Sequence, residues 1–106
     1  MIKIKIFRDL TGMVTGFYVT GHANTAPHGQ DIVCAAVSAL SQTALLGLGK
    51  HLKREVDFDI ANGRLQVSLK TPPDELTSAI FETMILGLIE IENINPKRVH
   101  ILEYRR

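Results

Sequence analysis

The fold is decided by the stretch Val56-Asp57-Phe58-Asp59-Ile60-Ala61-Asn62-Gly63-Arg64-Leu65-Gln66-Val67-Ser68-Leu69. Apolar residues recur at every second position on both sides of its Asn62-Gly63 pair. Such alternation is typical of a strand with one buried face. An Asn-Gly pair between two runs of this kind is the strongest short-range hairpin signal. Residues 56–69 are therefore predicted to form two antiparallel strands joined by a tight turn.

Three further segments have the pattern of strands. They are residues 2–6, Val14–Thr20 and Val99–Tyr104. The first has three isoleucines that alternate with lysines, which predicts a half-buried strand at the N-terminus. Residues 9–13 include Gly12 and are predicted to form the turn before the second strand. The whole chain should therefore contain five strands.

A first helix is predicted to begin at Asp31, which is a good N-cap residue. Apolar residues follow it at the spacing of one helix face. They are Val33, Val37, Leu40, Ala44 and Leu48. Glycines weaken the end of this helix, and the cations at residues 50–54 are typical of a helix C-terminus.

A second helix is predicted from Thr71 as the cap and Pro72 as the first helical residue, running to about Asn93. Its apolar residues cover more than one face; they are Leu76, Ile80, Phe81, Met84, Ile85, Leu86, Leu88, Ile89 and Ile91. A helix that is apolar around most of its circumference needs a second burial partner. We expect a homodimer in which residues 73–93 contribute to the interface. The alternative is deeper burial within one subunit.

The predicted element order is strand-strand-helix-strand-strand-helix-strand, or ββαββαβ. Five amphipathic strands and two helices predict a two-layer α+β sandwich of the broad α/β class, with both helices on one face of the sheet. With 106 residues and no linker, the chain is expected to be a single domain over residues 1–106.

The composition excludes several classes of protein. The net charge of +1 argues against a general nucleic-acid partner, and the basic clusters at residues 50–54 and 97–98 lack interleaved aromatic residues. No continuous apolar run reaches about 18 residues, so no membrane span is expected. One cysteine excludes an intrachain disulfide and fits a reducing compartment. We expect a cytoplasmic protein.

The strongest candidate for chemistry is Cys34, within residues 21–40 (GHANTAPHGQDIVCAAVSAL). If Asp31 is the N-cap, Cys34 lies in the first helical turn, where unpaired N–H groups and the helix dipole stabilise a thiolate. His22 follows the preceding strand and is a suitable base for a thiol. Together these residues suggest a thiol nucleophile with its base.

Less specific interpretations stay open for each of these residues. A lone cysteine is most often a small core residue, and a histidine at a strand end is often only solvated. His28 lies in the same loop and competes with His22 as the base. His51 and His100 are expected to be structural or exposed. Ser38, one turn after Cys34 on the same helix face, either supports the site or bonds to the preceding turn, and we favour the second.

Other kinds of site fit less well. The cysteine and the loop histidines lack the paired spacing of zinc ligands, so no metal and no cofactor is expected. A glycine-bearing loop that enters a helix suits an anion, but no lysine or arginine occurs between Arg8 and Lys50. The small, neutral loop instead suits a peptide backbone with apolar side chains.

At these residues the chain resembles the ribosomal-processing cysteine protease family, called Prp, of Firmicutes and related bacteria. The motifs that carry the resemblance are Gly21-His22-Ala23 and residues 31–40 (DIVCAAVSAL), and it extends over essentially the whole length. The resemblance implies a small, dimeric α/β protein. It also implies removal of a short N-terminal extension, which ends in a hydrophobic, aromatic-rich segment, from the twenty-seventh protein of the large ribosomal subunit.

The resemblance assigns the nucleophile to Cys34, the base to His22 and a supporting acidic role to Asp31. Ser38 stays a candidate supporting residue, and Gly21, Ala23 and Gly29 are expected to belong to the loop that meets the substrate. Asp31 or Asn24 is expected to orient the histidine. The competing function is a non-catalytic, dimeric, ribosome-associated binding module in which Cys34 is a core residue.

Overall fold

The structure is a computed structural model that describes residues 1–21 and 29–106, with the backbone alone at residues 29–31. The elements in chain order are β1 (Ile2–Arg8), β2 (Val14–Thr20), α1 (Gly29–Leu46), the π-helical turn η1 (Gly47–His51), β3 (Val56–Ala61), β4 (Arg64–Leu69), α2 (Glu75–Ile94) and β5 (Val99–Arg105). This order confirms the predicted ββαββαβ arrangement.

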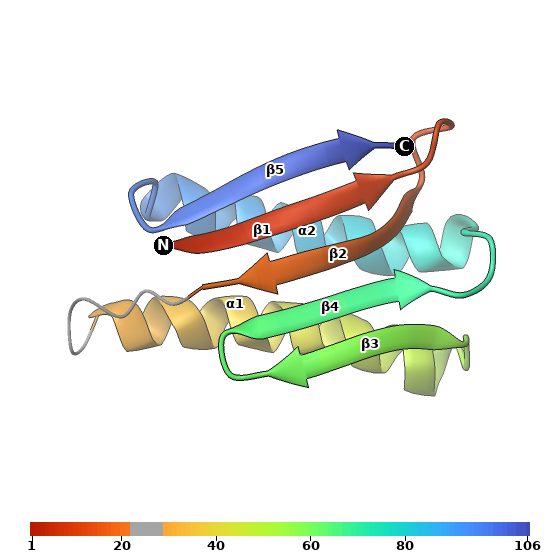
Figure 1. The fold of residues 1–106 in the computed structure, drawn as a ribbon, viewed down its shortest axis with the longest axis horizontal. Coiled ribbons are helices and arrows are strands. Elements are labelled where there is room, and N and C mark those ends of the chain that lie inside the picture. Colours follow the sequence, from red (N-terminus) through yellow and green to blue (C-terminus); the bar gives the residue numbers. More distant parts are fainter. Residues whose placement is uncertain (22–28) are drawn as a thin grey trace.

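The five strands form one mixed sheet in the order β3-β4-β2-β1-β5. All neighbours are antiparallel except β1 and β5, which are parallel. Both helices cover the same face of the sheet, and the other face is open (Figure 1). The predicted two-layer α+β fold is therefore confirmed. Strands β3 and β5 are the two edges of the sheet.

The core lies between the sheet and the helices. The alternating residues Ile2, Ile4 and Ile6 of β1 are buried, as the pattern at residues 2–6 predicts. From α2, Phe81 packs edge-on against Phe17 of β2, with ring centroids 6.1 Å apart. Burial of these apolar side chains is the main force that holds the two layers together.

Helix α2 begins three residues later than predicted. Asp74, not Thr71, is its N-cap: the Asp74 carboxylate accepts the N–H groups of Leu76 and Thr77 at 3.0 and 3.1 Å. The Thr77 hydroxyl accepts the Asp74 N–H in return, which completes a capping box. Pro72 does not start the helix because a residue that precedes a proline, here Pro73, is disfavoured in the helical region.

Helix α1 begins earlier than predicted. Its first residue is Gly29, so Asp31 is the third helical residue and not the N-cap. No proline lies between Gly29 and Asp31 to stop the helix, and an acidic residue in the first turn is favourable beside the positive end of the dipole. Cys34 is consequently the sixth residue of α1 and lies in its second turn, not its first.

The stretch Ile32–His51 has a mean hydropathy of 1.7 and is long and apolar enough to cross a membrane by length and composition. Polar residues interrupt it, which is why the sequence has no continuous apolar run of this length. Along this helix, Val33, Val37 and Leu48 belong to the core beneath the sheet. One such helix among the described residues is weak evidence for a span, because core helices of soluble proteins have the same properties.

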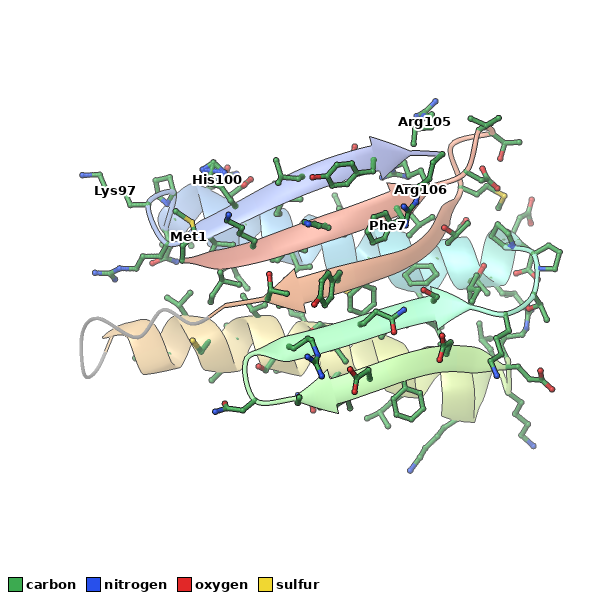
Figure 2. The ribbon with its side chains drawn as sticks, viewed as in Figure 1. Met1, Phe7, Lys97, His100, Arg105 and Arg106 are labelled. Carbon is green, nitrogen blue, oxygen red and sulfur yellow. The ribbon has the colours of Figure 1, made fainter. Side chains whose placement is uncertain are left out.

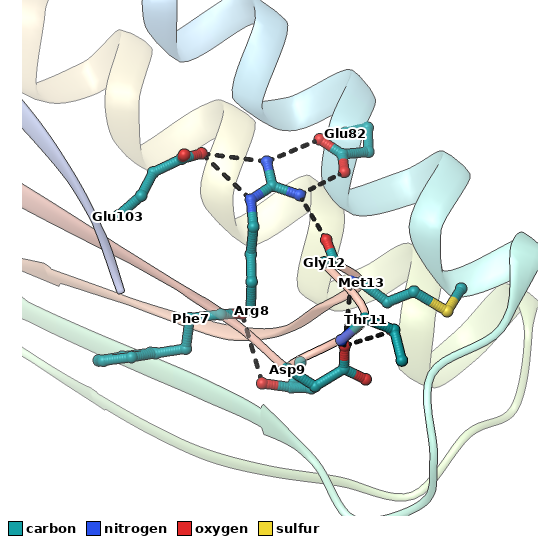
Figure 3. Close-up of polar contacts among 9 residues, drawn as sticks. Phe7, Arg8, Asp9, Thr11, Gly12, Met13, Glu82 and Glu103 are labelled. Atoms are coloured by element: carbon teal, nitrogen blue, oxygen red, sulfur yellow. Dashed lines mark hydrogen bonds and ion pairs between the residues drawn. The ribbon is translucent and has the colours of Figure 1, made fainter. Parts of the chain in front are cut away.

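Arg8 at the end of β1 ties three elements together (Figure 3). Its guanidinium donates to Glu82 of α2 at 2.7 Å and to Glu103 of β5 at 3.0 Å. It also donates to the Gly12 carbonyl at 2.9 Å. The hydrogen bond to Glu82, with the other contacts to both carboxylates, raises the pKa of Arg8 above its ordinary value. The side chain is only 15% exposed, so the cluster fixes α2 and β5 to β1.

Next to Arg8, the predicted turn at residues 9–13 is confirmed. The Asp9 carboxylate accepts the Thr11 hydroxyl at 2.6 Å and the N–H groups of Thr11 and Met13 (Figure 3). These bonds, with that from the Thr11 hydroxyl first, lower the pKa of Asp9. On the open face of the sheet, Phe7 stacks on Tyr104 at 5.7 Å, and Arg106 lies 4.4 Å above the Phe7 ring (Figure 2).

Candidate active site

A pocket of about 300 Å³ lies where α1, the beginning of β1, the end of β2 and the turn between β3 and β4 meet. Figure 1 shows this turn beside the N-terminal half of α1. The described residues that line the pocket are Ile2, Val19, Gly21, Cys34, Val37, Ser38, Ser41, Gln42, Ile60, Ala61, Asn62, Gly63, Arg64 and Leu65. The sole cysteine of the chain is among them.

Gly21 connects two of the elements that surround the pocket. Its N–H donates to the Gly63 carbonyl at 3.0 Å, which joins the end of β2 to the hairpin turn. Its φ is +92°, and a Cβ added there would lie 2.2 Å from the Met1 carbonyl oxygen. Only glycine therefore fits this position, directly before the segment that contains His22.

Cys34 lies between the core and the pocket. Its side chain is half-buried and packs against the buried core cluster, yet it also lines the pocket. Cys34 is therefore not a fully enclosed core residue, and it lies at the wall of a space that a ligand can enter. Because Cys34 lies in the second helical turn, its own N–H is beyond the unpaired donors of the helix start.

Three polar residues of α1 accompany the thiol in the pocket. Ser38 and Gln42 are exposed, and Ser38 shares the face of Cys34, as expected from its spacing of four residues. Ser41 is buried, and its hydroxyl donates to the Val37 carbonyl at 2.7 Å. From the sequence, we favoured a hydrogen bond from Ser38 to the preceding turn. In the structure, Ser41 makes a bond of this kind.

The opposite wall of the pocket is the hairpin turn. Asn62, Gly63 and Arg64 line it, but the Arg64 side chain lies on the open face of the sheet, opposite to the buried side chains of Leu65 and Val67. Arg64 pairs with Asp59 at 2.8 Å, which compensates the positive charge. The described part of the pocket therefore combines a thiol, hydroxyl and amide groups with apolar walls. Such a surface suits a neutral backbone with apolar side chains, the kind of ligand inferred from the loop composition.

The structure describes only some of the other predicted site residues. Gly29 and Asp31 lie in the first turn of α1. His22, Ala23, Asn24 and His28 lie outside the described residues, so the distance from a histidine to the thiol stays a prediction. His51 belongs to the π-helical turn and His100 to β5, and both are exposed, as expected.

The sequence did not point to the hairpin turn as part of the site. Asn62 and Gly63 correctly indicated a hairpin, but its place beside α1 depends on the strand order β3-β4-β2. In that order, Thr20 at the end of β2 pairs with Arg64 at the start of β4, which brings the turn to the pocket. No local sequence pattern encodes this pairing.

A small α+β domain with its only thiol in a ligand-sized pocket is an arrangement used by cysteine proteases. A family model described as "Cysteine protease Prp" matches residues 1–100. A Staphylococcus aureus (strain Mu50) protein named ribosomal processing cysteine protease Prp is 34% identical over 96 residues, which cover 87% of this chain and 89% of that protein. The chain therefore belongs to the Prp family of cysteine proteases, which is involved in ribosomal processing.

Other relatives agree with this assignment. The Prp protein of Bacillus subtilis (strain 168) is 50% identical over 40 residues, covering 38% of this chain and 36% of that protein. The crystal structure of SMU.848 from Streptococcus mutans has a TM-score of 0.84 and 28% identity, covering 100% of this chain and 96% of its own. The structure of Prp from S. aureus with a substrate peptide has a TM-score of 0.89 and 23% identity, covering 98% of this chain and 100% of that one, and it supports the fold.

Proposed function

We propose that this protein is a cysteine endopeptidase that removes the short N-terminal extension of the twenty-seventh large-subunit ribosomal protein. The observation that carries the proposal is the half-buried Cys34 thiol in the pocket of a chain that belongs to the Prp family. The S. aureus relative has been solved with a substrate peptide and with a covalently linked product peptide. A peptide substrate for this chain follows by analogy.

In the proposed mechanism, His22 removes the proton from the Cys34 thiol, and the sulfur attacks the carbonyl carbon of the scissile bond. The protonated His22 then gives its proton to the leaving amine, and the C–N bond breaks. The N-terminal fragment stays on Cys34 as a thioester. Water, deprotonated by His22, releases it as a carboxylic acid and restores the thiol. Asp31 or Asn24 would orient His22.

The carbonyl oxygen becomes negative during the attack and requires hydrogen-bond donors. Unpaired N–H groups at the start of a helix are one source of such donors. Since α1 begins at Gly29, the unpaired N–H groups end at Ile32, and the N–H of Cys34 itself is expected to be bonded within the helix. We therefore assign the donors to side chains that line the pocket, from Ser38, Gln42 and Asn62. Gly21, Ala23 and Gly29 are proposed to form the loop that contacts the substrate.

We also propose that the protein is a homodimer through α2. Five residues of this helix are buried within the subunit, including Phe81 and Leu88. Other apolar residues stay exposed, among them Leu76 (57%), Leu86 (67%) and Ile94 (77%). A mostly apolar groove of about 610 Å³ runs between α1 and α2, on the side away from the sheet. A dimer at micromolar concentration in sedimentation supports this part of the proposal, and a monomer contradicts it.

The decisive experiment offers the ribosomal protein precursor to the wild type and to the Cys34→Ala variant, with mass spectrometry of the products. We expect one cut by the wild type, at the end of the extension, and none by the variant. A precursor that stays intact with the wild type, together with a thiol that iodoacetamide modifies only after unfolding, supports the binding-module alternative. The site is proposed to act in the cytoplasm, where ribosomal proteins are made.

A further inference from the structure

Strand β3 has a free edge that leads into the pocket. It is the last strand of the sheet beyond β4, and its final residues, Ile60 and Ala61, line the pocket that holds Cys34. An edge strand presents a row of unpaired N–H and C=O groups, which a second strand can join. The direction in which these groups point follows from the register.

The backbone groups of Phe58 and Ile60 point outward. Lys70 N–H donates to the Glu55 carbonyl at 3.1 Å, so this opposed pair is a hydrogen-bonded one. Hydrogen-bonded pairs alternate along an antiparallel ladder, so Asp57, Asp59 and Ala61 also bond to β4. The intervening Phe58 and Ile60 direct their N–H and C=O groups away from the sheet. Within the described part of the chain, neither has a backbone partner on that side.

The side chains of Phe58 and Ile60 form an exposed apolar surface along the edge of β3. They pair with Val67 and Leu65 of β4, which are buried beneath α1. Phe58 and Ile60 are on the helix-covered face but stay 55% and 51% exposed, because the helices do not extend over the edge strand. A strand added to this edge would bury both side chains and satisfy their backbone groups.

The opposite edge, β5, differs from β3 in its first half. In the parallel pair of β1 and β5, Ile2 N–H donates to the Arg98 carbonyl and Arg106 N–H to the Arg8 carbonyl. These bonds make Ile101 an outward-facing residue of β5. Its N–H is occupied by the Glu92 carboxylate of α2 at 2.7 Å. The Val99 N–H donates to the Asn95 carbonyl, so the first half of edge β5 is occupied by groups of its own chain, whereas no such bond is made at Phe58 or Ile60 of β3.

We propose that the substrate of the proposed protease binds as an additional strand along β3, and that this pairing leads the scissile bond to Cys34. The proposal rests on the proposed function and specifies its substrate. The segment beside the cleavage site would be extended, with apolar side chains at alternate positions against Phe58 and Ile60. On the other face it would meet Asp57 and Asp59, so an acidic residue there is disfavoured. Four to five residues would fit, at about 3.4 Å per residue.

The first test measures amide hydrogen exchange by NMR in the Cys34→Ala variant, with and without a synthetic peptide that spans the junction of the ribosomal protein extension. We expect the Phe58 and Ile60 amides to exchange rapidly alone and to become at least tenfold slower with the peptide. The Ile101 amide should not change. A bound peptide that leaves Phe58 and Ile60 unprotected would overturn strand addition. So would protection in the free protein that grows with protein concentration, because a second copy would then occupy the edge.

The second test uses Ile60→Pro, which removes the outward N–H while leaving the β4 ladder intact, since proline is tolerated on an edge strand where its nitrogen faces away from the sheet. We expect KM to rise roughly tenfold with kcat nearly unchanged. Ile60→Thr is the matched control, because it also loses apolar surface but keeps the N–H. Equal KM values for the two variants would overturn the backbone pairing. A wild type that cleaves no such peptide instead contradicts the proposed function itself.

Discussion

The two edge strands of the sheet, β3 and β5, differ in the hydrogen bonding of their outward backbone groups. At β5, Glu92 occupies the outward N–H of Ile101, and the Arg8 cluster binds the strand to β1 and α2. At β3, Phe58 and Ile60 are about half exposed, and their outward backbone groups have no partner among the described residues. Proteins usually protect an edge of this kind from other strands. An edge left open beside a thiol pocket is a place to receive a peptide.

The charge pairs and the candidate site of this small domain lie at opposite ends of the sheet. The end of the sheet around Arg8 carries charge pairs that fix the layers to each other. The end around Cys34 carries the pocket and the end of the open strand β3. Changes at Arg8 should therefore alter unfolding without altering cleavage, and changes to the side chains proposed to do the chemistry should alter cleavage without altering unfolding.

The largest effect is expected from His22→Ala at the pocket end. Loss of the general base should lower kcat/KM for the junction peptide by at least about 100-fold, because base catalysis contributes 10²–10⁴-fold. The free energy of unfolding should change little. His28→Ala is the matched control and should cleave at nearly the wild-type rate. If the two variants exchange these behaviours, His28 is the base.

The next effect concerns the backbone beneath the pocket. Gly21→Ala places a Cβ at 2.2 Å from the Met1 oxygen and forces a φ of +92° on an alanine. We expect a loss of stability of about 1–3 kcal/mol, measured by urea unfolding. Gly49→Ala is the control, since nothing lies within 4 Å of its added Cβ, and it should be neutral or slightly stabilising. Equal stabilities would contradict the strained geometry at Gly21.

At the opposite end, Arg8→Met removes the shared cation from Glu82 and Glu103. These carboxylates are 44% and 52% exposed and can return to water, so the expected loss of stability is about 1–2 kcal/mol. Cleavage of the junction peptide by the folded variant should match the wild type. A strong fall in kcat at unchanged stability would show that the two ends of the sheet are not separate.

A smaller loss of stability is expected from Glu92→Ala, which removes the partner of the Ile101 N–H at the β5 edge. The Ile101 N–H loses its charged partner and becomes open to water, at a cost of about 1 kcal/mol. Amide exchange at Ile101 should accelerate, so that β5 behaves like β3. Unchanged exchange at Ile101 would mean that Glu92 does not protect this edge.

The smallest effect is a pH dependence at the start of α2. The hydrogen bond from Arg54, followed by that from the Thr77 N–H, holds the pKa of Asp74 below its ordinary value of 3.8. A carboxyl with a lowered pKa in the folded state adds stability above its unfolded pKa and loses it as the pH falls through the folded value. The stability difference between wild type and Asp74→Asn should therefore be present at neutral pH and shrink below about pH 3.8. A difference that stays constant with pH would contradict this coupling.

Much of the fold could be predicted from the sequence, because the strands have clear alternation and the Asn62-Gly63 pair marks one turn. The predicted starts of the helices were less accurate. Because Pro72 is a favourable first helical residue, the N-cap of α2 was predicted at Thr71, whereas the capping box is formed by Asp74. Cys34 was selected as the nucleophile, which stays a prediction; it lines a pocket, but it lies in the second turn of α1 and not in the first. The hairpin wall of that pocket and the difference between the edges depend on strand order, which no local pattern contains.

The most direct test of the account is a rapid-quench reaction of the wild type and Cys34→Ala with the junction peptide, followed by intact-mass measurement and mapping. We expect a transient adduct on Cys34 of the wild type, with the mass of the N-terminal fragment. Both adduct and cleavage should be absent from the variant. Cleavage by Cys34→Ala at the wild-type rate would contradict the assignment of this thiol as the nucleophile.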